Sequence, residues 1–311
     1  MKYAITLVSL PTMSEVIHYT ACPICNSKNI AFALEAEDYT VSHKKFPIWK
    51  CEDCTGCFTQ DVPDLEHIGP YYNAEAYVSH SDTKKGIINR LYHSIRKITL
   101  KQKRNLVQEE SKLKSGKLLD IGAGTGAFAH QMNISGWTVT GLEPDEIARQ
   151  NALKLHGLNL LPSDQLFSFP TESFDVVTMW HVLEHVHSLH EYMDAIKKIL
   201  RPNGVAMIAV PNYTSYDAQH YGVYWAAWDV PRHLYHFSPK SMSTLAEEHG
   251  MEVVHHIPMI FDSYYVSMLS EKYKNGKYKN LSAFINGNES NTKAQRDPKK
   301  FSSVIYVIKK K

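Results

Sequence analysis

The chain has 311 residues, of which 43% are apolar and 21% are charged, and its formal net charge is +2. This composition is that of a globular protein with one large or two smaller domains, and it excludes an intrinsically disordered chain. No apolar run reaches the length of a membrane span, and residues 1–10 lack the small-residue cleavage site of a signal peptide. We therefore expect a cytoplasmic protein without membrane contact. Its near-neutral charge disfavours nucleic acid as a partner but leaves local basic patches open.

All five cysteines lie in one short N-terminal stretch. Cys22 and Cys25 form one C-x-x-C knuckle, and Cys51 and Cys54 form a second. Four thiolates from two knuckles predict a tetrahedral, structural zinc site of the zinc-ribbon type, whereas disulfides are disfavoured in a reducing compartment. Cys57 extends the second knuckle and could replace Cys54 as a ligand. A closed four-thiolate site has no open position for water, so we expect no catalysis there.

The cysteine-rich module is predicted to cover residues 1–70, and a helical linker is predicted over residues 71–112. Apolar residues in this linker recur at three- and four-residue spacing and form one stripe: Ile87, Leu91, Ile95 and Ile98. The other face is basic: Lys84, Lys85, Arg90, Arg96, Lys97, Lys101, Lys103 and Arg104. Two interpretations stay open. The basic face is either solvated on a helix that packs against the next domain, or it binds a phosphate-bearing or nucleic-acid substrate.

Residues 118–126 predict a buried strand and a glycine turn, with a helix beginning near Ala127. Glycines let the backbone approach a ligand closely, and free N–H groups at a helix start suit a carboxylate or phosphate. Glu143, at the end of the next predicted strand, can accept two hydrogen bonds from a ribose diol. The glycine pattern alone also fits a dinucleotide. Asp120 favours S-adenosylmethionine, whose ammonium and sulfonium are positive, unless this carboxylate only caps the loop.

Strand and helix patterns alternate over residues 113–311, which predicts an α/β fold with a parallel sheet and helices on both faces. The predicted strands are residues 117–121, 138–143, 158–161, 175–180, 205–210, 251–257 and 303–308. An insertion of about residues 262–300 precedes the last strand. Insertions of this length are usually functional lids or disordered stretches.

Four stretches in a fixed order carry a resemblance to a known family. They are LLDIGAGTG at residues 118–126, GLEPDEIA at 141–148, FDVVTMWHVLEH at 174–185 and LRPNG at 200–204. Together they resemble the class I S-adenosylmethionine-dependent methyltransferases over residues 112–311. The resemblance implies a Rossmann-like, seven-stranded, mostly parallel sheet with an antiparallel last strand. It also implies the following cofactor-binding residues: Asp120, Gly122, Ala123, Gly124, Gly126, Glu143, Asp164, Trp180 and His181.

By this resemblance the glycine loop would line the methionine and ribose of the cofactor. Glu143 would hold the ribose hydroxyls and Asp164 would lie near the adenine. Trp180 and His181 would flank the methionine moiety after the fourth strand. Of these assignments Asp164 is the least specific, because the polar residues Ser163 and Gln165 adjoin it.

His181, Glu184 and His185 also match H-x-x-E-H, the inverted zinc-protease signature. Two histidines four residues apart on a helix can share a metal. The motif, however, directly follows the strand at which the resembled family places the rim of its active site. We therefore expect no protease here. His185 is either hydrogen-bonded to a loop or serves as a catalytic base or substrate contact, and both interpretations stay open.

The substrate side is expected in loops beyond the strand ends. Asn212 follows the fifth predicted strand and would face the transferred methyl group. The segment 225–237, WAAWDVPRHLYHF, is rich in aromatic and histidine residues and suits an enclosed pocket. Trp225 and Trp228 are predicted to contact substrate, or alternatively to pack beneath the insertion as a satellite core.

Three further residues of this segment carry chemistry. His233 and His236, like His185, could take a proton from the incoming nucleophile, since histidine titrates near neutral pH. Arg232 could anchor a carboxylate or phosphate of the substrate. The predicted reaction is an in-line displacement at the sulfonium methyl, in which the protein mainly aligns nucleophile, methyl and sulfur.

The sequence thus predicts methyl transfer to an unidentified small-molecule acceptor, and it leaves the acceptor atom and the oligomeric state open. One alternative is an RNA base methyltransferase that grips RNA with the zinc module and the basic helix 84–104. A third interpretation is a non-catalytic, zinc-dependent interaction module. The near-neutral charge favours a small molecule, the basic helix favours RNA, and the intact glycine loop with its two acids favours an enzyme.

Overall fold

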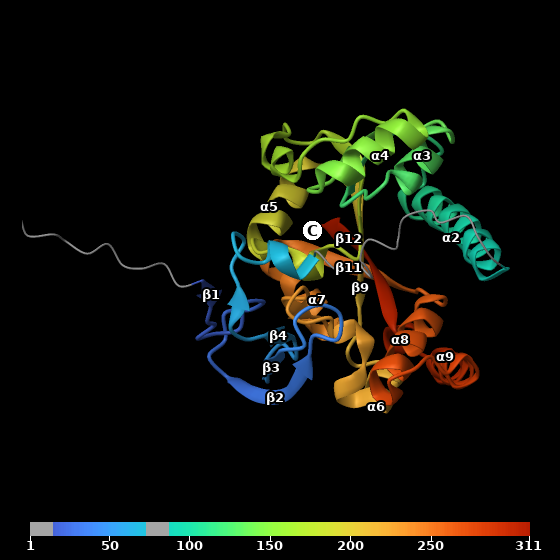
Figure 1. Cartoon of the computed structure of the whole chain (residues 1–311). Helices are drawn as coiled ribbons and strands as arrows, with labels where there is room; N and C mark the ends of the chain where they lie inside the picture. Colours follow the sequence, from blue (N-terminus) through green and yellow to red (C-terminus); the bar gives the residue numbers. More distant parts are fainter. Residues whose placement is uncertain (1–14, 73–86) are drawn as a thin grey trace, which may run out of the picture.

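The computed structural model describes residues 15–72 and 87–311, and it describes residues 87–97 by their backbone alone. A six-stranded sheet forms its centre. The strands are β6 (Lys117–Ile121), β7 (Thr138–Leu142), β8 (Phe174–Trp180), β9 (Leu200–Pro211), β11 (Met251–Pro258) and β12 (Ser303–Lys310). Their order across the sheet is β11-β12-β9-β8-β6-β7, with β9, β11 and β12 labelled in Figure 1. Five strands are parallel, and β12 runs antiparallel between β9 and β11.

Helices cover both faces of this sheet, as predicted, because side chains alternate between the two faces along each strand. Leu118 of β6 packs in the core beneath α2 (Ile87–Ser111) and α3 (Ala127–Asn133). Its neighbour Leu119 packs in the opposite core, beneath α5 (Leu189–Ile199) and α7 (Pro239–Glu248). A further described helix, α4 (Glu146–His156), follows β7.

Residues 158–161, predicted as a strand, form only an isolated parallel bridge between Leu142 and Leu161. Pro162 follows directly, and proline has no N–H with which to extend the pairing. The chain then enters the 3-10 helix η2 (Ser163–Ser168). The sheet of the described residues therefore has six strands, where the resemblance implied seven.

The N-terminal module is joined to the rest of the chain by a shared sheet. Its strands are β1 (Val16–Ile17), β2 (Ile30–Glu37), β3 (Lys45–Cys51), β4 (Cys57–Thr59) and β5 (Val62–Pro63). Strands β2, β3 and β4 form an antiparallel sheet with β10 (Tyr235–His236), which comes from the aromatic and histidine segment. Figure 1 labels β2, β3 and β4 in the blue, N-terminal part of the chain. Cys22, Cys51 and Phe58 also belong to the same buried core as α5 and α7.

The predicted insertion is a pair of helices packed on α6. Its elements are α8 (Asp262–Asn275), α9 (Asn280–Ala294) and the 3-10 helix η6 (Pro298–Lys300). Helices α8 and α9 lie beside α6 (Tyr216–Tyr221) in Figure 1. Ser290 of α9 donates a hydrogen bond to the buried carboxylate of Asp217 in α6 at 3.0 Å. Ser270 of α8 accepts one from the backbone N–H of Ala226 at 2.9 Å. Within the described parts of the chain, no helix combines the length and apolarity needed to cross a membrane.

The predicted linker helix corresponds to α2 and to the shorter 3-10 helix η1 (Gly69–Tyr72) that precedes it. Lys84 and Lys85 of the predicted basic face, and residues 1–10, lie outside the described residues. The side chains of Ile87, Arg90, Leu91, Ile95, Arg96 and Lys97 also lie outside the description. Further 3-10 helices in the described parts of the chain are η3 (Leu183–His185), η4 (Gly222–Tyr224) and η5 (Ala226–Trp228).

Candidate functional site

The loop of residues 122–126 joins β6 to α3 where the strand order of the sheet reverses, between β6 and β8. Parallel sheets bind ligands at such points. Gly122, Gly124 and Gly126 have φ values of 72°, 55° and 77°, which favour glycine. A Cβ at Gly122 would lie 2.3 Å from Val182, so the loop packs closely on the segment after β8. A Cβ at Gly124 would meet no described atom within 4 Å, which leaves open space beside this residue.

Two buried carboxylates flank this loop. Glu143 is 8% exposed and accepts hydrogen bonds from the backbone N–H groups of Gly124 at 2.8 Å and Asp145 at 3.1 Å. These bonds position the carboxylate and leave further lone pairs for a ligand. Asp120 is 1% exposed and accepts a hydrogen bond from the Thr178 hydroxyl at 2.8 Å. Burial raises the pKa of Asp120 to about 7, so a positively charged ligand group would stabilise its ionised form.

Lys103 lies near this site and not on an exposed basic face. Its ammonium is 4.2 Å from the ring centroid of Trp180, a cation–π distance. Burial lowers the pKa of Lys103, against the opposing effect of the nearby carboxylates of Asp262 and Asp120. Phe128 packs edge-on against Trp180, with ring centroids 5.2 Å apart. Sequence reasoning missed Lys103, because nothing in its local pattern separates it from the other basic residues of the helix.

His181 is held between two carboxylates at the end of β8. Its Nε2 lies 2.8 Å from Asp262 Oδ2, and its Nδ1 lies 3.4 Å from Glu184 Oε1. Burial alone would lower the pKa of His181, but these two carboxylates raise it to about 10. Both ring nitrogens of His181 therefore face carboxylates, and among the described residues His181 does not belong to the potential ligand group that contains His185. Asp262 begins α8 and was not predicted as a site residue.

Asp164 is exposed in the first turn of η2. The carbonyl of Leu161 accepts a hydrogen bond from the backbone N–H of Glu143 at 2.9 Å, which brings the start of η2 to the end of β7. Asp164 therefore lies three residues after Leu161, the residue whose backbone contacts Glu143. Its contact with an adenine stays a prediction.

Two of the three predicted catalytic histidines lie together beyond β8. The rings of His185 and His233 meet edge to face, with centroids 4.6 Å apart. Burial and the neighbouring His233 lower the pKa of His185 to about 4, so its ring is neutral at pH 7.

The third predicted catalytic histidine, His236, has a structural position instead. The Thr59 hydroxyl donates to the His233 carbonyl at 2.7 Å, so His236 Nε2, 3.0 Å from the same hydroxyl oxygen, must be the donor in that contact. Burial lowers the pKa of His236 well below its usual range. These contacts favour a structural role for His236 over that of a catalytic base.

Three predicted substrate contacts are engaged inside the protein. Asn212 is fully buried, and its amide donates to two backbone carbonyls that precede β12. Trp225 and Trp228 belong to a buried cluster that includes Val266 of α8. Their indole N–H groups donate to Asp217 and to a backbone carbonyl, each at 2.9 Å. These contacts favour the satellite-core interpretation of both tryptophans, because their polar groups are already paired.

Arg232, the fourth predicted substrate contact, connects three parts of the chain. Its guanidinium is 1% exposed and lies 2.7 Å from Asp229 and 3.1 Å from Asp38, a residue of the N-terminal module. It also donates to the backbone carbonyl of Tyr71 at 2.9 Å. A guanidinium enclosed by these groups stabilises the fold and does not reach a substrate. Sequence reasoning missed Asp38 and Asp229 because the contacts span distant segments.

Replacing Arg232 with methionine should destabilise the protein strongly. The change leaves the buried carboxylates of Asp38 and Asp229 without their cation, and breaking a buried ion pair in this way costs about 3–5 kcal/mol. Chemical denaturation of both proteins measures this loss. Arg201→Met is the matched control, because Arg201 pairs with Asp175 but is 41% exposed, and such pairs contribute less than about 1 kcal/mol. Unchanged stability of Arg232→Met with a raised KM would restore the substrate-anchor hypothesis.

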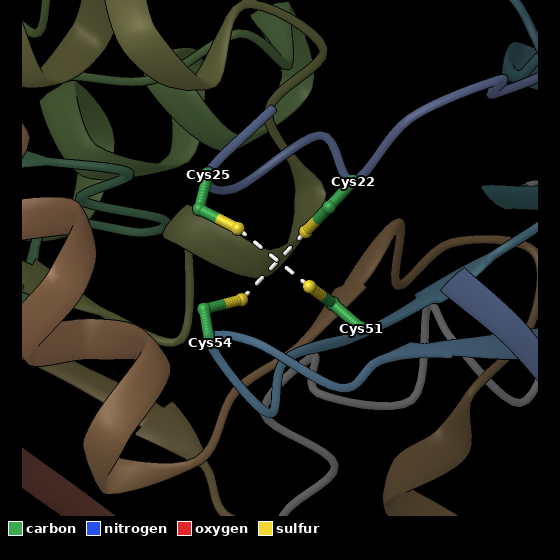
Figure 2. A group of neighbouring side chains, drawn as sticks. All are labelled: Cys22, Cys25, Cys51 and Cys54. Carbon is green, nitrogen blue, oxygen red and sulfur yellow. Dashed lines mark hydrogen bonds between the residues drawn. The ribbon is translucent and has the colours of Figure 1, made fainter. Parts of the chain in front are cut away.

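Four thiols of the N-terminal module point toward a common centre (Figure 2): Cys22, Cys25, Cys51 and Cys54. The sulfurs of Cys22 and Cys54 are 3.7 Å apart, and those of Cys25 and Cys51 are 3.6 Å apart. A tetrahedral zinc ion with Zn–S bonds of about 2.3 Å separates its sulfurs by roughly 3.8 Å. The spacing of the four thiols therefore fits such an ion.

Backbone N–H groups support two of these sulfurs. The N–H groups of Ile24 and Gly56 each lie 3.4 Å from a sulfur, that of Cys22 and that of Cys54 respectively. Such contacts stabilise the charge of a thiolate ligand. Cys57, the first residue of β4, is also buried, but it is not among the four convergent thiols. This geometry favours Cys54 over Cys57 as the fourth ligand, and the ligand set stays a prediction.

Residues 92–256 match a family model described as a methyltransferase domain, and this match covers more than half of the 311-residue chain. The chain belongs to this methyltransferase family. The matched range of the methyltransferase contains the glycine loop, Asp120, Glu143, His185 and His233. It does not contain the four convergent cysteines.

The methyltransferase is 35% identical over 109 residues to a ubiquinone biosynthesis O-methyltransferase of Haemophilus ducreyi, covering 32% of this chain and 46% of that protein. It is 36% identical over 104 residues to a protein of the same description from Vibrio atlanticus, covering 31% and 44%. The methyltransferase thus spans about half the length of these curated relatives. A solved S-adenosylmethionine-dependent methyltransferase from Archaeoglobus fulgidus is similar with a TM-score of 0.46 and 20% identity, covering 69% of this chain and 94% of that one.

Proposed function

We propose that this chain transfers a methyl group from S-adenosylmethionine to an oxygen atom of a small-molecule acceptor. The observation that carries the proposal is the glycine loop between two buried carboxylates, Asp120 and Glu143, at the point where the strand order reverses. The printed names of the two curated relatives, both O-methyltransferases, support oxygen as the acceptor atom.

The site residues fit this cofactor in charge and in shape. Asp120 would bind its ammonium, because a cation compensates the cost of an ionised carboxylate in a buried position. Glu143 would accept hydrogen bonds from the ribose hydroxyls while the Gly124 N–H holds its carboxylate in place. Trp180 would cover the methionine end, and Lys103, which lies over its ring, offers a positive charge for the cofactor carboxylate.

The protein contributes alignment more than bond chemistry. S-adenosylmethionine supplies a methyl group on a good leaving group, the sulfonium. Holding the acceptor in line with this methyl group can lower the barrier by about 7–11 kcal/mol. Glu184, His185 and His233 lie beyond the end of β8 and would form the acceptor side of the site.

We also propose that Cys22, Cys25, Cys51 and Cys54 bind a structural zinc ion. Their sulfur spacing and closed, four-thiolate geometry support this role. An RNA substrate has less support, because Lys103 of the predicted basic face is engaged with Trp180.

Calorimetry and product analysis test the proposed function together. The purified full chain is expected to bind S-adenosylmethionine and S-adenosylhomocysteine, and to form S-adenosylhomocysteine when phenolic small molecules are added. Nicotinamide dinucleotide serves as the competing cofactor, because the glycine pattern alone fits it too. Binding of the dinucleotide without binding of S-adenosylmethionine would overturn the proposal. If the chain bound the cofactor but methylated RNA and no phenol, RNA would replace a small molecule as the acceptor.

A further inference from the structure

A second group of potential metal ligands lies apart from the four cysteines. Glu184, His185 and His233 each offer one ligand atom, and these atoms lie within 4.8 Å of one another. Glu184 and His185 belong to η3, directly after β8, and His233 comes from the segment before β10. The group therefore combines two segments that are far apart in the chain.

The carboxylate of Glu184 is buried without hydrogen bonds. Its residue is 0% exposed, and neither carboxylate oxygen has a hydrogen-bond partner among the described residues. The nearest cationic group among the described residues is the His181 ring, whose Nδ1 lies 3.4 Å from Oε1 as an ion pair. A buried, ionised carboxylate without donors is costly unless another group binds its oxygens. A cation between Glu184 and the two histidines would satisfy this requirement.

Backbone carbonyls fix the tautomer of both histidines. Nδ1 of His185 lies 3.0 Å from the carbonyl oxygen of Arg232, and Nδ1 of His233 lies 2.9 Å from that of Ala227. A carbonyl oxygen can only accept, so Nδ1 carries the hydrogen in both rings and Nε2 presents its lone pair. A ring N–H bound to a carbonyl is the usual support of a histidine that ligates a metal through its other nitrogen. The backbone at Arg232 is itself held by the buried ion pairs of its side chain.

We propose that Glu184, His185 and His233 bind a divalent transition-metal cation, such as manganese or iron(II), on the acceptor side of the site. Two imidazoles and one carboxylate suit such ions and leave coordination positions open for other oxygen ligands. The H-x-x-E-H pattern thus indicates a metal, but with different ligands from a protease. His181 pairs with Asp262, and His233 takes its place.

The role of this cation rests on the proposed methyl transfer. A coordinated hydroxyl group of the acceptor loses its proton to solvent base more readily than a free one. The acceptor oxygen then attacks the methyl carbon, a C–O bond forms and the S–CH3 bond breaks. The electron pair of that bond stays on sulfur, which leaves the neutral thioether of S-adenosylhomocysteine. The inference therefore narrows the acceptor to molecules whose hydroxyl can coordinate a metal, such as catechols.

Titration of the full chain with Mn²⁺, followed by electron paramagnetic resonance, tests the site without relying on activity. The electron paramagnetic resonance signal of the free hydrated ion decreases as Mn²⁺ binds to the protein. Mn²⁺ prefers oxygen and nitrogen ligands to thiolates, so the four-cysteine site does not interfere. We expect about one Mn²⁺ per chain in protein pretreated with a mild chelator, and an affinity at least about tenfold lower in Glu184→Gln. His185→Gln, a second variant, should show the same loss.

Glu271→Gln is the matched control. Glu271 is also a buried carboxylate, 5% exposed, but it accepts hydrogen bonds from Asn275 and Asn286 and lies in α8, outside the proposed ligand group. This variant should bind Mn²⁺ like the unaltered protein. Absence of Mn²⁺ binding in the unaltered protein, or equal binding in all four proteins, would overturn the inference and leave Glu184 as the counter-ion of His181. Binding of S-adenosylmethionine without Mn²⁺ rejects only this inference, whereas binding of Mn²⁺ without S-adenosylmethionine rejects only the proposed function.

Discussion

Replacing Gly124 with arginine is expected to abolish cofactor binding while the protein stays folded. The Cβ position at Gly124 faces open space beside Glu143, so a long side chain would occupy the volume that the proposed cofactor needs. Its positive charge would also repel the ammonium and sulfonium. We expect the affinity for S-adenosylmethionine to fall by about 100-fold or more, equivalent to roughly 2.7 kcal/mol. Isothermal titration calorimetry measures this change.

The strain of a non-glycine residue at this position needs its own control. Gly124 has a φ of 55°, and an L-residue in this region costs roughly 1–2 kcal/mol. Gly157 ends α4 with a φ of 66°, and a Cβ there also meets no described atom within 4 Å. Gly157→Arg therefore adds the same charge and a similar strain away from the loop. If both variants lost the cofactor equally, or neither did, the loop would not be the binding site.

Loss of a zinc ligand should unfold the N-terminal module and the site with it. Structural zinc contributes an apparent 10–16 kcal/mol, to order of magnitude, in zinc-finger peptides, which exceeds the stability of many domains. Cys51→Ser removes one of the four thiols, and we expect it to abolish zinc binding. Because β4 of the module pairs with β10, the segment that carries His233 should lose order as well. Zinc content by mass spectrometry and thermal unfolding by circular dichroism report the two effects.

Cys57→Ser provides the comparison for this experiment. Cys57 is as deeply buried as Cys54, at 2% exposure, but it lies outside the four convergent thiols. The serine variant should therefore keep one zinc ion per chain and most of its thermal stability. A Cys51→Ser protein that melts at the unaltered temperature would contradict a stabilising metal at these cysteines.

Features with a local origin could be predicted well. The predicted strand at residues 117–121 coincides with β6, because a buried strand next to glycines is recognisable within a few residues. The convergence of Cys22, Cys25, Cys51 and Cys54 also follows from two short knuckles. The strand predicted at residues 158–161 from the alternating pattern is reduced to one bridge, because Pro162 limits its pairing.

Features that depend on distant partners could not be predicted. Arg232 is polar and Trp225 is amphipathic, and both lie in a segment beyond a strand end. Residues of these types at such positions typically contact substrate. Their actual partners, Asp38 and Asp217, are contributed by the N-terminal module and by α6. Lys103 likewise gains its role only from the position of Trp180. A single sequence carries no local sign of these pairings.

The sequence by itself determined the methyltransferase fold class, the glycine loop with its two carboxylates, and the four convergent thiols, because each depends on residues that are close in the chain or on a short periodic pattern. Only the tertiary structure decided which polar residues face a ligand and which are paired with other groups inside the protein. A buried polar group must find a partner, and that partner is chosen by the packing of segments far apart in the chain. Glu184, His185 and His233 are brought together by this packing, and Glu184 alone is left without a hydrogen-bonded partner among the described carboxylates that are fully buried.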